Sequence, residues 1–338
     1  MPSARRREPG GNGPLRWLLT RVLAGLAALA VLLVGAAALL GYQFTGEPAP
    51  WAASQGADAA WVGSWEDTGA LDALLTTGGV DTLYVYAGDI GADGSVEREP
   101  GTADLLSWLA AEHPDVRALA WLRHVTEGSS LVRDRFDEEA GATLAAGAAE
   151  VAADGFAGLH LEIRPVTVND PSVPDLMGVV REALGEDAVF SVQAQHVELV
   201  PGGRVPSFVT EGEEKYWSAG YLDRVTEHAD EVVLPGVGAD MPMDVLYGGF
   251  MVRQVTEGVG ALADRDEVTV RFGLPAHTSG DWGPVEDTES IGTALTGIRL
   301  GMTRVEPPEG MTLGVALYVA DEADAEDLAA YTAGWLLS

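Results

Sequence analysis

The sequence has no cysteine among its 338 residues. This absence excludes disulfide bonds, thiolate metal sites, iron–sulfur clusters, cysteine nucleophiles and lipid attachment through a thiol. Basic residues are scarce as well, with 20 Lys and Arg against 52 Asp and Glu, and the formal net charge is −32. A field of that sign repels nucleic acid, so we expect no nucleic-acid partner.

The sequence also lacks the glycine-rich loops that cradle nucleotide phosphates. Neither a dinucleotide-binding fingerprint nor a Walker pattern occurs in it, and we expect no cofactor. Apolar residues, by contrast, are plentiful: 47% of the chain is hydrophobic and 21% is charged. Such a composition favours a packed core, and the length suits one single-core domain of roughly 250 to 300 residues.

The first 50 residues differ in charge from the rest. They hold two glutamates and five arginines, namely Arg5, Arg6, Arg7, Arg16 and Arg21. Residues 22–42 carry no charge, and as a helix they would be roughly 31 Å long, close to the thickness of a bilayer's hydrocarbon core. Because the arginines precede this run and no basic residue closely follows it, the positive-inside rule puts the N-terminus in the cytoplasm.

The alternative interpretation of residues 22–42 is a cleaved signal peptide, whose apolar stretch is usually only about 7 to 15 residues long. The longer run favours an uncleaved anchor. We therefore expect a cytoplasmic basic tail at 1–21, a transmembrane anchor at 22–42, a linker at 43–58 and an extracellular domain at 59–338. This organisation describes a single-pass protein of the cell membrane.

Eight short apolar, β-branched or aromatic runs follow the linker, and segments with helical spacing separate most of them. The runs are residues 60–65, 81–89, 116–124, 156–166, 188–199, 231–240, 268–278 and 311–321. Strand alternating with helix implies a parallel sheet, and eight such units fit a (β/α)8 TIM barrel better than a doubly wound open sheet. We predict an α/β chain with a TIM barrel preceded by one transmembrane helix.

In this fold the chemistry lies at the C-terminal ends of the strands. In the fourth run, aliphatic residues alternate with His160, Glu162 and Arg164, and a period of two puts the two sets on opposite faces. The polar set would then point into the barrel, where amides, charges and aromatic faces suit a hydroxyl-rich ligand. We predict that the substrate is bound by Trp65, Tyr86, His124, His160, Arg164, Gln193, Gln195, His277 and Tyr318.

Three segments carry a family resemblance. DGFAGLHLEIRP, residues 154–165, resembles the fourth-strand motif of the family 18 glycoside hydrolases, the chitinase-like barrels. RFGLPAHTSG, residues 271–280, is similar to that family's seventh-strand pattern, and GVALYVADEADAEDLAAYTAGWL, residues 314–336, resembles its last strand and helix. The resemblance covers most of residues 60–338. It implies a TIM barrel that acts on, or binds, a polysaccharide or oligosaccharide.

The sequence departs from the family at the catalytic motif. On the resemblance, the spaced aspartates of the motif correspond to Ala157, His160 and Glu162, and its catalytic glutamic acid corresponds to Arg164. An arginine stays charged and cannot donate a proton at usable pH. Asp240 is displaced by two residues from the tyrosine and aspartate of the family's sixth strand. The motif is therefore degenerate.

Hydrolysis of a glycoside generally needs an acid and a second group that stabilises the cationic centre. The neighbouring guanidinium of Arg164 would keep Glu162 ionised, which suits a nucleophile, a base or an electrostatic stabiliser. The acid would then come from Asp89, Asp240 or Asp321 at other strand ends. These four carboxylates are the candidate catalytic residues.

Three functions stay open at this point. The first is a tethered glycoside hydrolase with a rearranged site, and the second is a non-catalytic pseudoenzyme barrel that binds a glycan or a protein. The third is a metal-dependent hydrolase with ligands among His124, His160, His196 and His277. Because no His-x-His ends a strand and no His-Glu-x-x-His helix occurs, we expect no metal site.

Overall fold

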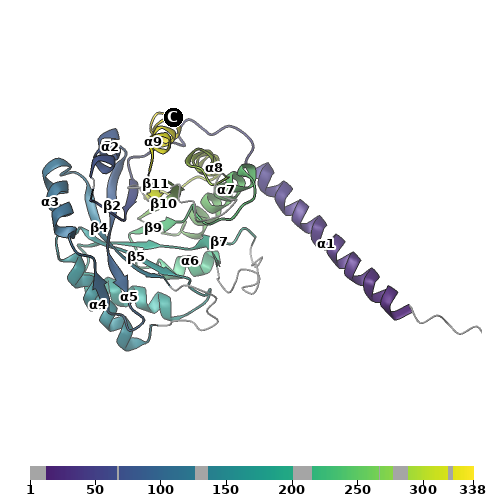
Figure 1. Ribbon diagram of the computed structural model, residues 1–338, viewed down its shortest axis with the longest axis horizontal. Coiled ribbons are helices and arrows are strands. Elements are labelled where there is room, and N and C mark those ends of the chain that lie inside the picture. The colour runs from purple at the N-terminus through teal and green to yellow at the C-terminus, as the bar shows by residue number, and fades with distance from the viewer. Residues whose placement is uncertain are drawn as a thin grey trace, which may run out of the picture.

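Eight parallel strands close into a ring in the computed structural model, which describes residues 13–66, 68–125, 136–200, 215–265, 267–276, 288–318 and 323–338. The strands are β1 (Asp58–Val62), β2 (Val80–Ile90), β4 (Arg117–Val125), β5 (Gly158–Arg164), β6 (Val189–Gln193), β9 (Glu231–Leu234), β10 (Val268–Pro275) and β11 (Met311–Tyr318). Each pairs with the next, and β1 pairs with both β2 and β11, which closes the ring (Figure 1). The predicted TIM barrel is confirmed.

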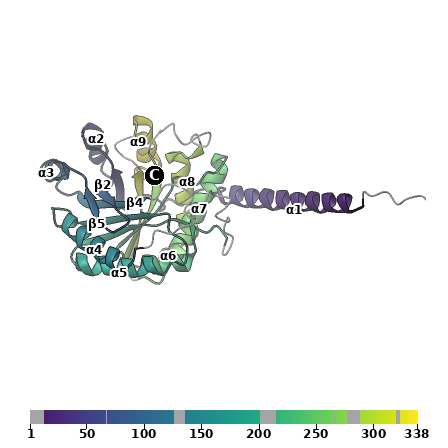
Figure 2. The same cartoon turned by 60° about the horizontal axis from the view of Figure 1, so that its bottom comes forward.

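Helices surround the ring (Figure 2). They are α2 (Gly69–Thr77), α3 (Thr102–Glu112), α4 (Glu138–Ala152), α5 (Ser172–Leu184), α6 (Ala219–Val225), α7 (Asp244–Ala261), α8 (Ile291–Arg304) and α9 (Ala325–Tyr331), which a π-helical turn (Thr332–Leu336) follows. The apolar spacing of the sequence explains them: in α4, Leu144, Ala148 and Val151 are buried on one face. The helix begins at Asp137, whose side chain accepts a hydrogen bond from the amide of Ala140.

Two of the predicted strands are less than half as long as expected. The strand predicted at 231–240 ends at Leu234, because Pro235 follows and has no amide hydrogen to continue the ladder. The strand predicted at 188–199 divides into β6 and a two-residue strand, β7 (His196–Val197), which pairs with β8 (Tyr216–Trp217) instead of a barrel strand. Gln195 therefore lies between two strands.

The N-terminal helix α1 (Gly13–Gln43) projects away from the barrel (Figures 1 and 2). Its segment Arg16–Gln43 is long and apolar enough to cross a membrane, and none of its most apolar stretch is buried. A signal sequence would have the same features. The stretch predicted as a linker lies against α8: the amide of Ala49 donates to Thr303 Oγ1 at 2.8 Å, and Ala52 is buried.

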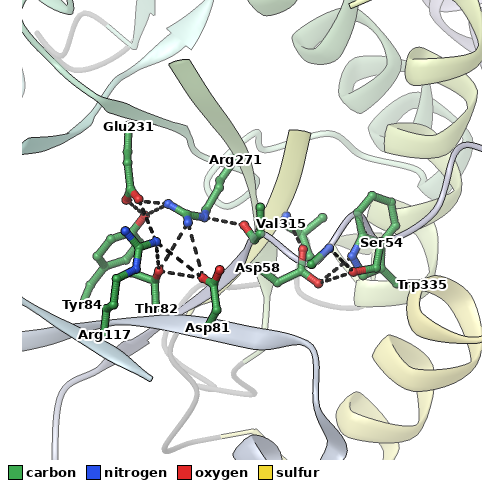
Figure 3. A network of polar contacts seen from close by, with 12 residues as sticks. Ser54, Asp58, Asp81, Thr82, Tyr84, Arg117, Glu231, Arg271, Val315 and Trp335 are labelled. Carbon is green, nitrogen blue, oxygen red and sulfur yellow. Dashed lines mark hydrogen bonds and ion pairs between the residues drawn. The ribbon is translucent and has the colours of Figure 1, made fainter. Parts of the chain in front are cut away.

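A buried ion pair lies near the N-terminal ends of the strands (Figure 3). Arg271 donates from Nη1 to Glu231 Oε2 at 2.5 Å and to the Tyr84 hydroxyl at 2.9 Å, and from Nε to the Ala57 carbonyl at 2.6 Å. Arg117 at the start of β4 contacts the other oxygen of Glu231 at 3.3 Å. Buried charges are tolerated when they are paired and hydrogen-bonded in this way. The network fills this end of the barrel and leaves the opposite end, the mouth, for a site.

A second buried network joins the two ends of the domain through Asp58, the first residue of β1 (Figure 3). The carboxylate of Asp58 accepts hydrogen bonds from Ser54 Oγ at 2.9 Å, Tyr331 OH at 2.9 Å and Trp335 Nε1 at 2.8 Å. It also accepts one from the amide of Val315 in β11 at 3.0 Å. One carboxylate thus connects the segment before the first strand, the last strand and the C-terminal helices.

Candidate functional site

Aromatic rings fill the centre of the barrel below the mouth. His160 stacks on Tyr84, with ring centroids 3.8 Å apart, and Trp61 lies edge-on to His160 at 5.5 Å. Trp61 Nε1 donates to His160 Nε2 at 3.1 Å, so Nδ1 carries the imidazole hydrogen and donates to Ser191 Oγ at 2.8 Å. Burial lowers the pKa of His160 to about 3. The ring is therefore neutral and lies beneath the mouth.

Glu162 lies one inward-facing position further along β5 than His160. Its side chain is only 1% exposed, yet both of its oxygens have hydrogen-bond donors. Trp121 Nε1 donates to Oε2 at 2.9 Å, and Arg164 Nε donates to Oε1. Attraction to Glu162 outweighs the effect of burial, which alone would lower the pKa of Arg164, and raises that pKa. The guanidinium of Arg164 is thus held against the buried side chain of Glu162.

The rim of the mouth carries a second ion pair, between Arg123 Nε and Asp89 Oδ1 at 2.7 Å. The guanidinium of Arg123 lies over the ring of Tyr86, 4.7 Å from its centroid. Burial raises the pKa of Asp89, but hydrogen bonds from Arg123 and Tyr86 outweigh burial and leave that pKa below its usual value. Asp89 is therefore a carboxylate at neutral pH.

A β-bulge brings Asp89 to this position. The pairing of β2 with β4 shifts between Tyr86 and Gly88, so that Asp89 becomes the register partner of Arg123. Gly88 has a φ of 150° and lies against the carbonyl of Glu97 in the short strand β3 (Val96–Arg98), where a side chain would not fit. Without the bulge, the alternation of β2 would turn Asp89 toward the helices.

Seven side chains from four strands thus form one group, here called the mouth cluster. They are Tyr86, Asp89, Trp121, Arg123, Glu162, Arg164 and Tyr318. Tyr318 of β11 joins it through Trp121, whose ring centroid is 6.5 Å away, and through electrostatic interaction with Arg164. Trp121 and Arg123 were not among the site residues predicted from the sequence. The register of β4 against β5 is what identifies them. Trp121 pairs with His160 and Arg123 with Glu162, so both side chains face inward as well.

Several predicted site residues lie elsewhere. His124 is on the helix-facing side of β4, where Nδ1 lies 2.8 Å from the Ile90 carbonyl and the ring packs edge-on against Phe136. Trp65 packs against the outer hydrophobic layer that lies between the strands and the helices. Gln195 is buried between β6 and β7. Gln193, in contrast, is the register partner of Glu162 on β6 and so faces inward beside the mouth cluster. The side-chain oxygens of both have no hydrogen-bond partner among the described residues. His277 and Asp321 lie outside the described residues.

Asp240 belongs to a second polar group, in the loop that follows β9. Its carboxylate forms an ion pair with Lys215. Glu289 holds this loop, because its Oε2 accepts from the amide of Gly238 and its Oε1 from the amide of Asp240, both at 2.9 Å. Burial raises the pKa of Glu289 despite these hydrogen bonds. Glu289 was not among the site residues predicted from the sequence.

Metal ligation was one of the functions left open by the sequence. Among the described ranges, no group of three or more His, Asp or Glu side chains is placed to hold a metal ion. His160 illustrates the reason, since both of its ring nitrogens are engaged in hydrogen bonds, one with Trp61 and one with Ser191.

No protein-family model and no curated protein matches the sequence. Solved structures do match the fold. A chitinase from Chromobacterium violaceum is 13% identical, with 82% of this chain and 98% of that chain covered and a TM-score of 0.54. A class V chitinase from Nicotiana tobaccum in complex with NAG4 is 11% identical, with 82% and 98% covered and a TM-score of 0.54.

The spore cortex-lytic enzyme of Bacillus cereus is also similar, at 9% identity, with 82% of this chain and 74% of that chain covered and a TM-score of 0.54. All three likenesses extend over most of the closed barrel. Together with the ring of eight parallel strands, they show that this chain shares the closed (β/α)8 fold of these two chitinases and of the spore cortex-lytic enzyme.

Proposed function

We propose that the barrel binds a glycan at its mouth without hydrolysing it, and that α1 anchors it in the cell membrane with the barrel outside. One observation supports the first part of this proposal, the binding of a glycan without hydrolysis. Arg164 occupies the position at which the family resemblance places the proton donor, and its guanidinium is paired with the buried carboxylate of Glu162.

The chemistry of the mouth cluster supports binding over hydrolysis. A glycosidase acid must be protonated before it reacts, and an arginine cannot serve because its protons are not given up at usable pH. Glu162 accepts hydrogen bonds on both oxygens, and the lowered pKa of Asp89 keeps it ionised. These two carboxylates position Arg164 and Arg123, and neither is arranged to donate a proton.

The same cluster offers the groups that a sugar needs. Tyr86 and Tyr318 are partly exposed aromatic rings, on whose faces the apolar side of a sugar ring can pack. Arg123 and Arg164 each use Nε for their carboxylate, and the remaining N–H donors of a guanidinium can reach hydroxyl or amide oxygens. Because the similar structures include chitinases and a spore cortex-lytic enzyme, we choose chitin oligosaccharides and peptidoglycan fragments as first probes.

A hydrolase is the second candidate, because of one observation. Glu289 has a pKa raised by burial, which is the property of a general acid, and it holds the loop after β9 on the mouth side of the barrel. In that mechanism Glu162 would stabilise the cationic centre, and Glu289, Asp240 or Asp321 would donate the proton.

Binding and turnover should be measured together on the full-length protein in detergent or nanodiscs. Calorimetry with chitin oligosaccharides and with peptidoglycan fragments tests binding, and release of reducing ends tests hydrolysis. We expect binding of one probe class, weakened about tenfold or more in Tyr86→Ala, with no release. Release that is lost in both Glu162→Gln and Glu289→Gln would establish the hydrolase instead, and failure of both probe classes to bind would reject the proposed ligand.

The anchoring has its own test. We expect the intact protein to keep its N-terminus, to resist alkaline extraction from membranes, and to expose a C-terminal tag to protease on whole cells. A mature N-terminus located after residue 42 would show that the segment is a cleaved signal sequence.

A further inference from the structure

The end of α1 fits into a notch on α7. Two adjacent glycines of α7, Gly248 and Gly249, form the notch, and neither has room for a side chain. A Cβ atom at Gly249 would overlap the carbonyl oxygen of Leu40, and one at Gly248 would overlap the ring of Phe44. The backbones therefore approach each other as closely as they do at other glycine-mediated helix crossings.

Hydrogen bonds from α8 fix the chain that leaves the notch. Arg304 donates to the side-chain oxygen of Gln43 and, from Nη2, to the carbonyl of Thr45 at 3.0 Å. Thr303 Oγ1 accepts from the amide of Ala49 at 2.8 Å. Since these contacts begin at the last residue of α1, no free spacer separates α1 from the barrel.

Exposed apolar side chains lie beside the notch. Met243, the residue before α7, is 50% exposed and Val245 is 41% exposed. Val245 Cγ2 would lie 3.8 Å from a Cβ atom at Gly41, so it is level with the last turn of α1. Tyr42, next to Gly41, is exposed too, and tyrosine is typical of the interface between membrane and water.

We infer that the start of α7, at Met243 and Val245, rests in the headgroup region of the bilayer that α1 crosses. The inference depends on the proposed anchoring by α1 and adds a second contact with lipid. The lipid is the expected occupant because these side chains continue the apolar surface of the last turn of α1 onto the start of α7. A bilayer surface covers such side chains without a partner protein.

The position of this contact bears on the ligand. α7 follows β9, so its first turn lies at the C-terminal ends of the strands, the side on which the mouth opens. Contact of Met243 and Val245 with lipid holds that edge of the mouth at the membrane surface. The glycan that enters is therefore one that lies close to the membrane, and not one that is reached at the end of a long stalk.

The absence of cysteine makes the test direct, because each introduced cysteine is the single labelling site. Nitroxide labels at Met243→Cys and Val245→Cys are measured in nanodiscs for accessibility to oxygen and to a water-soluble nickel complex. Val179→Cys on α5 is the matched control, since Val179 is 43% exposed on another side of the barrel. Val31→Cys, on the exposed apolar part of α1, reports whether α1 is inserted.

We expect the ratio of oxygen to nickel accessibility at positions 243 and 245 to exceed that at 179 several-fold and to approach that at 31. Equal ratios at 243, 245 and 179, with position 31 in lipid, would overturn the inference while leaving the anchor intact. A water-like ratio at position 31 would reject the anchor itself and the inference with it. The two failures are thus distinguishable.

A substitution in the notch gives an independent readout. Gly249→Leu is expected to push α1 off α7 and to return the label at position 243 to water, while the label at 31 stays in lipid. Gly260→Leu is the control on the same helix, because a Cβ atom there meets nothing within 4 Å. A label at 243 that stays in lipid in Gly249→Leu, with the fold retained by circular dichroism, would show that the notch does not set the contact.

Discussion

Trp121 and Glu162 are joined across β4 and β5 by a hydrogen bond of 2.9 Å from Nε1 to Oε2. The strand register makes this pairing possible, since Arg123, two residues after Trp121, lies opposite Glu162. The indole and the guanidinium of Arg164 together hold one carboxylate in place. Glu162 is therefore an organising residue of the mouth cluster, and its removal should disturb the positions of its neighbours.

The two ion pairs of the mouth should differ in their effect on stability. Glu162 is 1% exposed and Asp89 is 52% exposed. Glu162→Gln removes a charge-assisted hydrogen bond in a buried place and should lower the free energy of unfolding by about 1.5 to 3 kcal/mol. Asp89→Asn breaks an exposed pair and should change it by about 1 kcal/mol or less. Urea titration of the two variants checks this contrast, and equal losses would refute it.

The buried ion pair of Arg271 and Glu231, at the other end of the barrel, should contribute more to the free energy of unfolding. Arg271→Met leaves the Glu231 carboxylate buried, with the half-exposed Arg117 as its remaining cation. Removing one partner of a buried pair typically costs about 3 to 5 kcal/mol. The double variant Arg271→Met/Glu231→Leu should lose less than the two single variants added together, because it leaves no lone charge. A strictly additive cycle in urea denaturation would contradict the coupling.

The buried imidazole of His160 predicts a dependence on pH. Burial lowers its pKa to about 3, whereas the unfolded chain binds the proton near the ordinary value of about 6.5. Between these values the unfolded chain binds more protons, so the stability that His160 contributes is complete above pH 6.5 and is lost as the pH falls toward 3. Imidazole nitrogen NMR should show a neutral ring with the hydrogen on Nδ1 at pH 5. Protonation with a midpoint near 6.5 would contradict this.

The buried side chain of Asp58 predicts the opposite dependence of stability on pH. Burial raises its pKa and outweighs its hydrogen bonds, so its contribution to stability is complete below about pH 4 and is lost as the pH rises through the raised value. Asp58→Asn removes this titration but leaves one donor facing the new amide. The difference in unfolding free energy between the parent and Asp58→Asn should therefore shrink as the pH rises above 4. A difference that does not vary with pH would refute the assignment.

The fold could be predicted because its signals are local. Alternating strands and helices specified the barrel, and the period of two in the fourth run specified the inward face of β5. The fourth-strand motif led directly to Glu162 and Arg164, which the structure brings into contact. A period of two along one strand is enough to predict that such residues face the same side.

The other site residues depend on how neighbouring strands pair. The pattern of a single strand does not contain that information. Asp89 faces inward through a bulge, and Trp121 joins Glu162 through the register of β4 against β5. His124 was selected for its position at a strand end, but it alternates with Arg123 and so faces the helices. Glu289 reaches its loop from a segment distant in sequence, and only the folded chain reveals that contact.

The Asp58 network also constrains how the protein is made. Ser54 and Asp58 emerge early during synthesis, but Tyr331 and Trp335, which share the same carboxylate, lie 273 and 277 residues after Asp58. The first strand therefore cannot complete its hydrogen bonds until the C-terminal helices have been made. Until then the barrel has open strand edges, and this unfinished barrel is the species that a chaperone or a protease would meet.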